Sequence, residues 1–172
     1  LSVTNLSALD STQVGALSTS QVAALSTTQL KGLTTTDIGE LATTQVAALS
    51  AAQVGALSPT NFSALSATQV GALSVTQVKG VTVDQIKGLT TTDIGELADT
   101  QVGALSTSQV GALATTQAQQ LSTTQLAILA STQVAALGAA NFSALNATQV
   151  GSLSETQFKG LTTAQLGALT AA

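Results

Sequence analysis

The apolar and polar positions of the chain repeat every eight residues from Leu1 to Ala172, giving 21 octads and four further residues. Counted from its leucine, each octad has Leu at position 1, except for Val81, and an apolar residue at position 6. Position 5 is Gln, Asn or Asp in every octad, and Leu25–Gly32, with the sequence LSTTQLKG, is typical. A period this short predicts an array of small units that stack on one another.

The spacing of the apolar positions excludes both regular strands and one long helix. Positions 1 and 6 are five and three residues apart, whereas side chains on one face of a strand recur every two residues. On a continuous helix, at about 100° per residue, the apolar stripe would rotate by roughly 80° in each octad and would face no partner. The pattern therefore predicts a helix that ends and restarts in every octad.

Helix-start signals stand at position 2. This position is Ser, Thr, Asp, Asn or Gly in 18 of 22 occurrences, and these residues accept backbone N–H bonds at an N-cap. Position 5 follows three residues later, so that Ser26 with Gln29 matches a capping box. Pro59 directly follows Ser58, at the first helical position, where proline is favoured. All four lysines occupy position 7, and six of the eight acidic residues lie at positions 2 to 5, at the cap or in the first half of the proposed helix, as a helix dipole favours.

These features predict an all-α fold, a tight superhelical solenoid with one short helix of about two turns, roughly seven residues, in each octad. Leu and the position-6 residue are expected to point inward and to form a narrow apolar axis. Thr, Ser and Gln are expected to face water or to satisfy the helix ends. The alternative is a β-solenoid, which the abundance of Thr and Val suggests. The apolar spacing, the capping pattern and Pro59 favour the helical fold.

The domain organisation is predicted to be a single array over residues 1–172 with a higher-order repeat. The octad LTTTDIGE occurs at Leu33–Glu40 and again, 56 residues later, at Leu89–Glu96. A related segment occurs three times, at Asn5–Leu9, Asn61–Leu65 and Asn141–Leu145. The first interval is seven octads and the second is ten, which indicates a three-octad insertion before the third copy. Seven octads are explained either by block duplication or by a whole number of superhelical turns. Because the chain begins in mid-pattern, we expect it to be a piece of a longer array.

Composition removes most classes of functional site. The chain has no His, Cys, Tyr, Trp or Arg, so neither a Ser-His-Asp nor a Cys-His site can form, and a zinc site would lack nitrogen and sulfur ligands. A net charge of −4 with only four lysines gives no nucleic-acid footprint. No uninterrupted apolar run approaches the length of a membrane span, and no secretion signal is visible. We therefore predict no catalytic, cofactor-binding or metal-binding residue, no nucleic-acid partner and no membrane insertion.

Two carboxylate pairs are the nearest approach to a chemical site. Asp37 with Glu40, and Asp93 with Glu96, are three residues apart and therefore neighbours on one helical turn. Such a pair could hold calcium weakly or act as a general acid and base. Neither has the dense oxygen cluster of a calcium loop, so we interpret both as solvated surface pairs.

The remaining residues of interest are asparagines that could accept glycans and phenylalanines that could form a binding surface. Asn-x-Ser/Thr triplets that could accept glycans begin at Asn5, Asn61, Asn141 and Asn146. In a chain so rich in Ser and Thr, repetition accounts for them. Aromatic residues at position 6 are predicted to lie in the core, namely Phe62, Phe142 and Phe158.

Units such as Leu25–Leu30 (LSTTQL) and Leu105–Val110 (LSTSQV) resemble the Leu-Thr/Ser-x-x-Gln-Val/Ile/Leu tandem repeats of large bacterial proteins, which are often secreted or surface-associated and adhesin-like. The resemblance covers the whole chain and implies an extracellular or cell-surface location, with no catalytic residue to carry over. We predict a non-catalytic structural or interaction module, a spacer or scaffold. The alternative is a binding module whose Thr/Ser/Gln lattice holds a glycan, another protein, a second copy of itself or ice.

Overall fold

The computed structural model describes residues 2–169, which form 21 α-helices and no β-strand. The predicted all-α solenoid of one short helix per octad is confirmed, and the β-solenoid alternative is wrong for these residues. Leu1 and residues 170–172 of the predicted array lie outside the described part. The chain divides into two compact units, Leu1–Leu89 and Thr90–Ala172.

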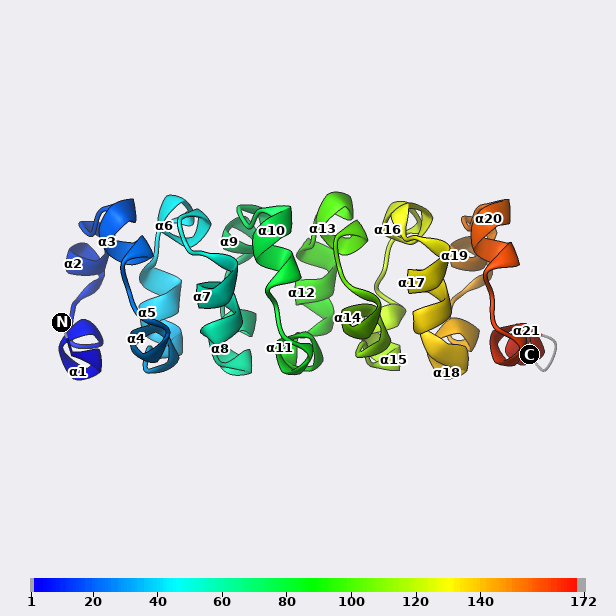
Figure 1. Cartoon of the computed structure of the whole chain (residues 1–172), viewed down its shortest axis with the longest axis horizontal. Helices are drawn as coiled ribbons and strands as arrows, with labels where there is room; N and C mark the ends of the chain where they lie inside the picture. Colours follow the sequence, from blue (N-terminus) through cyan, green and yellow to red (C-terminus); the bar gives the residue numbers. More distant parts are fainter. Residues whose placement is uncertain (1, 170–172) are drawn as a thin grey trace. The chain divides into compact units, whose positions relative to one another are not determined.

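The helices follow one another in chain order with links of a few residues (Figure 1). The first unit contains α1 (Val3–Leu6), α2 (Ser11–Gly15), α3 (Thr19–Ala23), α4 (Thr27–Lys31), α5 (Thr35–Glu40), α6 (Thr43–Ala47), α7 (Ala51–Ala56), α8 (Pro59–Ser63), α9 (Ala67–Gly71), α10 (Val75–Lys79) and α11 (Val83–Gly88). The second unit contains α12 (Thr91–Glu96), α13 (Asp99–Gly103), α14 (Thr107–Gly111), α15 (Thr115–Ala118), α16 (Thr123–Ile128), α17 (Ser131–Ala136), α18 (Gly138–Ser143), α19 (Ala147–Gly151), α20 (Glu155–Lys159) and α21 (Thr163–Leu169).

Most helices are capped by their position-2 residue, as α4 illustrates, whereas α18 begins at the position-2 residue Gly138 itself. Ser26 is extended (φ −72°, ψ 156°) and its Oγ accepts from Gln29 N, while Gln29 Oε1 accepts from Ser26 N at 2.8 Å. The helix ends when Leu33 N donates to Leu30 O at 3.3 Å and the chain turns toward the next cap. Because the cap and the leucine link lie outside the helix, most helices have five or six residues rather than the predicted seven.

The core consists of positions 1 and 6, as predicted. Val54 and Leu126, both at position 6, are 0% exposed. Of the three predicted core aromatics, Phe62 and Phe142 are buried, but Phe158 is 38% exposed, so its prediction is wrong. The reason is that a position-6 side chain is covered by the turn that follows it, and in residues 2–169 no later turn covers Phe158.

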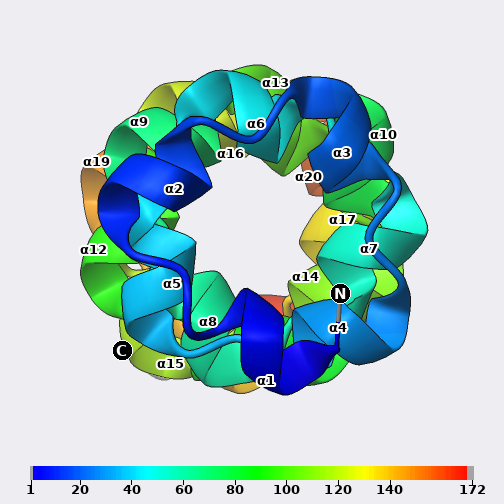
Figure 2. The same cartoon turned by 90° about the vertical axis from the view of Figure 1, so that its left-hand side faces the viewer.

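The superhelical turn comprises about three and a half octads. Within each unit a helix packs against the third helix along the chain, for example α8 against α11 and α13 against α16. Asn61 Nδ2 donates at 2.6 Å to the carbonyl of Leu33, which lies 28 residues earlier, or three and a half octads. Leu33 in turn lies 28 residues after Asn5, so the seven-octad interval from Asn5 to Asn61 spans two turns of the first unit. The repeat period thus matches a whole number of turns in the first unit. Seen end-on, α1 to α4 follow one another around one turn of the superhelix (Figure 2).

Side chains from several octads converge inside the first turn. Leu6 and Val14, at position 6, and the position-1 residues Leu17, Leu25 and Leu33 line a residual cavity of only about 10 Å³ together with the neighbouring Asp37 and Leu41. This volume holds at most one water molecule. The expected apolar interior is therefore present and closely filled, but it is built between successive turns rather than within a single ring of helices.

Candidate functional site

The position-5 glutamine is the side chain on which the stacking of turns is organised, and Gln85 shows the arrangement. It is 0% exposed. Its Oε1 accepts from Thr82 N at 2.7 Å, which closes the capping box of its own helix. Its Nε2 donates to Val54 O at 2.8 Å and to Leu57 O at 2.9 Å, both in the preceding turn. One amide therefore satisfies a helix start and also joins two turns.

The same bond recurs along both units, 28 to 31 residues back. Its donors in the first unit are Gln45, Gln53, Asn61, Gln69, Gln77 and Gln85. Its donors in the second unit are Gln125, Gln133, Asn141, Gln149, Gln157 and Gln165. We call this series the glutamine ladder. The prediction that Gln satisfies the helix ends is confirmed by the capping bonds, but the prediction that Gln otherwise faces water is wrong for the ladder residues, because they are buried.

Two position-5 glutamines of the first turn, Gln13 and Gln21, form the capping bond but not the cross-turn bond of the ladder. Gln13 and Gln21 are exposed and form their capping boxes like the others, with Oε1 accepting from Asp10 N and Ser18 N. Among the described residues, the Nε2 atoms of Gln13 and Gln21 have no acceptor. The capping role is therefore local, whereas the cross-turn role depends on a neighbouring turn.

Asp replaces glutamine at position 5 in two octads, and at Asp37 this reverses the direction of the hydrogen bond to the preceding turn. A carboxylate cannot donate to carbonyls, and Asp37 Oδ2 instead accepts from Ser7 Oγ, 30 residues earlier, at 2.6 Å and from Thr34 N at 2.6 Å. Burial raises the pKa of Asp37, but the hydrogen bonds from Ser7 and Thr34 outweigh it and hold the pKa below its usual value. Ser7, at position 7, thus supplies the hydrogen-bond donor that an acidic residue at position 5 requires.

The two carboxylate pairs are not the solvated surface pairs that the sequence predicts. Asp37 and Asp93 are buried, 6% and 8% exposed, and Asp37 is buried because position 5 faces the preceding turn of its unit. Asp93 accepts from Thr90 N at 2.6 Å as part of its capping box. Glu40 and Glu96 are half-buried. Within residues 2–169 no group of three or more acidic side chains is arranged to hold a metal ion, and no helix has the length and apolar character needed to cross a membrane.

The structure separates the four candidate glycan acceptors. Asn61 and Asn141 are buried and their Nδ2 atoms donate to backbone carbonyls of the preceding turn, so the folded chain does not present them. Asn146 is exposed and caps α19, with Oδ1 accepting from Gln149 N at 2.9 Å. Asn5 is also exposed. The buried pair are members of the ladder, in which the Asn amide takes the donor role of the Gln amide.

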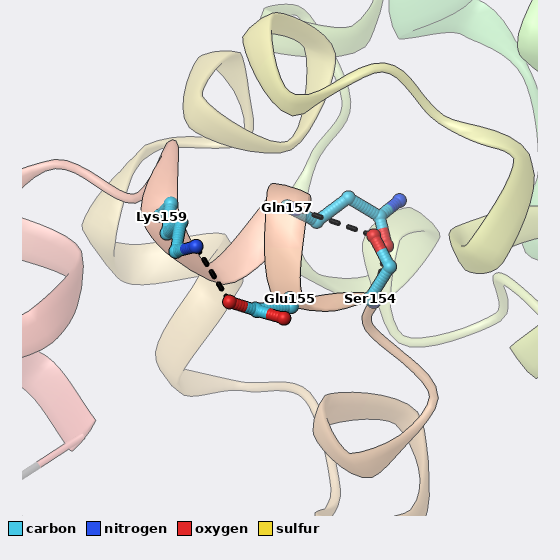
Figure 3. A network of polar contacts seen from close by, with 4 residues as sticks. All are labelled: Ser154, Glu155, Gln157 and Lys159. Atoms are coloured by element: carbon cyan, nitrogen blue, oxygen red, sulfur yellow. Dashed lines mark hydrogen bonds and ion pairs between the residues drawn. The ribbon is translucent and has the colours of Figure 1, made fainter.

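The outer surface carries hydroxyls and few charges, as α20 shows (Figure 3). Ser154 Oγ accepts from Gln157 N, and Lys159 pairs with Glu155 four residues earlier. The side chains of this ion pair are 75% and 81% exposed, and such surface pairs contribute little to stability. Lys159 lies in the last turn of its helix and Glu155 in the first, as the sequence predicted from the helix dipole. The surface of this octad therefore offers polar contacts but no reactive group.

Comparison with known proteins gives one family match. A model of the ALTTAQ repeat family matches residues 1–27 and 23–59. No curated protein matches the chain significantly. Over its first 59 residues the chain is thus similar to a tandem-repeat family, and this agrees with the repeat architecture that the helices display.

Proposed function

We propose that this chain is a non-catalytic structural repeat module, a spacer or scaffold that is lengthened by adding octads. The observation that carries the proposal is the glutamine ladder, in which the same donor and the same acceptor positions recur 28 and 31 residues apart in both units. Within each unit, successive turns are therefore held together largely by bonds of the same kind, whatever the identity of their surface residues.

Such an interface tolerates changes of length. Each octad with Gln or Asn at position 5 supplies one donor there, and the octads supply acceptor carbonyls at positions 6 and 1. Adding or removing whole octads therefore restores the same pairing one step along. Arrays whose units contact only their neighbours behave in this way. The three-octad insertion before Asn141 fits the proposal, because Asn141 still donates to Leu113 O, 28 residues earlier, at 2.7 Å.

A matched pair of deletions tests the proposal. Removing residues 33–88 joins Gly32 to Leu89 and takes out seven octads, while the new junction keeps the original local sequence LTTTDIGE. We expect unchanged helix content per residue in circular dichroism and a shorter maximum dimension in solution scattering. The control removes residues 33–84, which is half an octad less and places position 5 after position 8. This variant should lose helix and cooperative unfolding. Equal behaviour of the two variants, or an unshortened particle after the seven-octad deletion, would refute the spacer proposal.

The proposal extends to location. The resemblance of LSTTQL and LSTSQV to repeats of bacterial surface proteins supports an extracellular or cell-surface site. Antibodies against the chain should label intact cells that produce it. Labelling that appears only after the cells are permeabilised would contradict this location.

A second candidate function is the binding of a regular polar target, such as a glycan or ice. It is favoured by the exposed hydroxyls at positions 3 and 4, for example Thr35, Thr36, Thr91 and Thr92. The ladder glutamines do not contribute to this lattice, because they are buried. Thermal hysteresis and glycan-array binding test it, with Thr→Val changes at exposed positions 3 and 4 as the variants. An absence of both activities in the unmodified chain would dismiss it.

A further inference from the structure

Asn146 is the one potential glycan acceptor that copying of the octads does not explain. The other three acceptors stand at position 5 in copies of one segment, namely Asn5, Asn61 and Asn141. Asn146 stands at position 2, where no other octad has asparagine. Its octad, LNATQVGS, otherwise follows the octad of Ser66, LSATQVGA. An asparagine in place of the usual capping serine thus completes an Asn-Ala-Thr triplet at this position alone.

The side chain of Asn146 caps its helix through oxygen and leaves its amide nitrogen available. Oδ1 accepts from Gln149 N at 2.9 Å, and Asn146 N donates to Gln149 Oε1 at 2.8 Å. Among the described residues Nδ2 of Asn146 has no acceptor. An N-linked glycan is attached at Nδ2 and leaves Oδ1 in place. The modification is therefore compatible with the cap of α19.

The hydroxyl of the third residue separates the triplets further. Thr148 is exposed, and within residues 2–169 its Oγ1 has no hydrogen-bond partner. By contrast, Ser7 Oγ donates to Asp37 at 2.6 Å, and Ser143 Oγ donates to Ala140 O at 3.0 Å. A glycan acceptor needs the asparagine and the hydroxyl of its triplet together. The triplet of Asn146 offers both groups to solvent.

The exposure of Asn146 is a property of position 2 and does not depend on where the described chain ends. Several position-2 residues are followed by a further turn of their own unit and are nevertheless exposed, namely Ser26, Ser50, Ser106 and Ser122. Position 5 is different, because it faces the preceding turn and buries Asn61 and Asn141. A glycan at position 2 therefore lies outside the stack of turns.

We propose that Asn146 is an acceptor site for an N-linked glycan. The donor is an oligosaccharide that a membrane lipid carries through a pyrophosphate. The Asn146 Nδ2 attacks C1 of the first sugar, so that an N–C1 bond forms and the C1–O bond to the pyrophosphate breaks. The lipid pyrophosphate leaves with the electron pair, and Nδ2 gives one proton to a base of the transferase. Because such transfer takes place where a chain crosses a membrane, this proposal rests on the proposed extracellular location and not on the spacer function.

Three variants of the full chain separate the triplet from the fold. Asn146→Ser removes the acceptor and keeps the cap, because Ser66 caps the same helix sequence, ATQVG, in α9. Thr148→Val removes only the hydroxyl. Ser66→Asn creates a second Asn-Ala-Thr triplet in the same local structure. All three residues are exposed, so circular dichroism should show unchanged helix in each variant.

Transfer to the folded chain measures the outcome. The chain is incubated with a purified oligosaccharyltransferase and a lipid-pyrophosphate-linked oligosaccharide, and mass spectrometry locates the glycan. We expect a glycan on Asn146 and none on Asn61 or Asn141. The glycan should be lost in Asn146→Ser and in Thr148→Val, and Ser66→Asn should carry a second one.

Three results would overturn the proposal: an unmodified Asn146, a glycan on the buried Asn61 or Asn141 of the folded chain, or an unchanged glycan count in Ser66→Asn. Labelling of intact cells by antibodies tests the location separately. A failure of the glycan site is therefore distinguishable from a failure of the proposed location, because the transfer is measured on the purified chain.

Discussion

The ladder predicts that the same substitution, Gln to Glu, destabilises the fold strongly at one position 5 and hardly at all at another. Gln85 and Gln21 both stand at position 5 and both accept a cap N–H bond through Oε1. Only Gln85 also donates to the preceding turn. Replacing either with Glu keeps the cap acceptor, since Glu serves a capping box as well as Gln does. The variant Gln85→Glu, however, sets a carboxylate oxygen against two carbonyl oxygens.

The magnitude follows from those contacts. A protonated Glu at position 85 still donates one hydrogen bond and loses the other, which costs about 1 kcal/mol. Holding that proton at pH 7 costs up to about 3.7 kcal/mol, from about 1.4 kcal/mol per pKa unit above the ordinary Glu value of about 4.3. We therefore expect Gln85→Glu to lower the free energy of unfolding by about 3–5 kcal/mol at pH 7. The variant Gln21→Glu should change it by less than about 0.5 kcal/mol.

Chemical denaturation, followed by circular dichroism as a function of pH, measures this difference. The pKa of the introduced carboxyl is raised in the folded state, so its ionisation cost is absent below the unfolded pKa and grows as the pH rises through that value. The gap between the two variants should accordingly shrink toward about 1 kcal/mol in acid. Equal destabilisation of both variants, or a gap that does not depend on pH, would show that the ladder bonds do not hold the turns together.

The other predictions concern the acidic position, the core and the caps. Because the folded-state pKa of Asp37 is lowered, its stabilisation is present above the unfolded pKa and is lost as the pH falls through the folded one; Ser7→Ala should weaken this pH dependence of the unfolding midpoint. Leu126→Ala, at a fully buried site, should cost about 2–5 kcal/mol in denaturant unfolding. Leu166→Ala, 46% exposed at the same octad position, should cost less than about 1 kcal/mol, and equal costs would contradict the assignment of the core. Ala42 caps α6 without a side-chain acceptor, so Ala42→Ser should raise the melting temperature, with a gain of about 0.5–1 kcal/mol; an unchanged melting temperature would count against the side-chain cap.

Much of the fold is predictable from the sequence, since its local signals agree with one another. Ser26 caps its helix and Pro59 stands at the first helical position, as the pattern indicates. The lysines lie in the last turns of their helices. The helix length was overestimated, because the number of residues consumed by the cap and by the leucine link depends on how the chain reverses between octads. The predicted environment of the acidic residues is wrong. The sequence predicts that Asp37 and Asp93 face solvent, but they share position 5 with the buried glutamines and are buried like them.

A signal for the ladder was present in the sequence. Position 5 is never Glu, although Glu satisfies a capping box as well as Gln. A purely local cap leaves this exclusion unexplained, whereas a buried amide that must donate to carbonyls accounts for it. The pairing of Asp37 with a hydroxyl at position 7, in place of two carbonyls, obeys the same rule.

The helices are predictable from local residues, since a helix start, a helix stop and an apolar face are set within one octad. The number of helices, most of their caps and most of the core follow in the same way. Which octads meet is visible only in the folded chain, because a contact over 28 residues depends on how far each reversal rotates the chain, and that rotation is summed over three and a half octads. The second role of Gln85, the burial of Asp37 and the exposure of Phe158 all follow from that distance. Each depends on whether a neighbouring turn is present, which no single octad can encode.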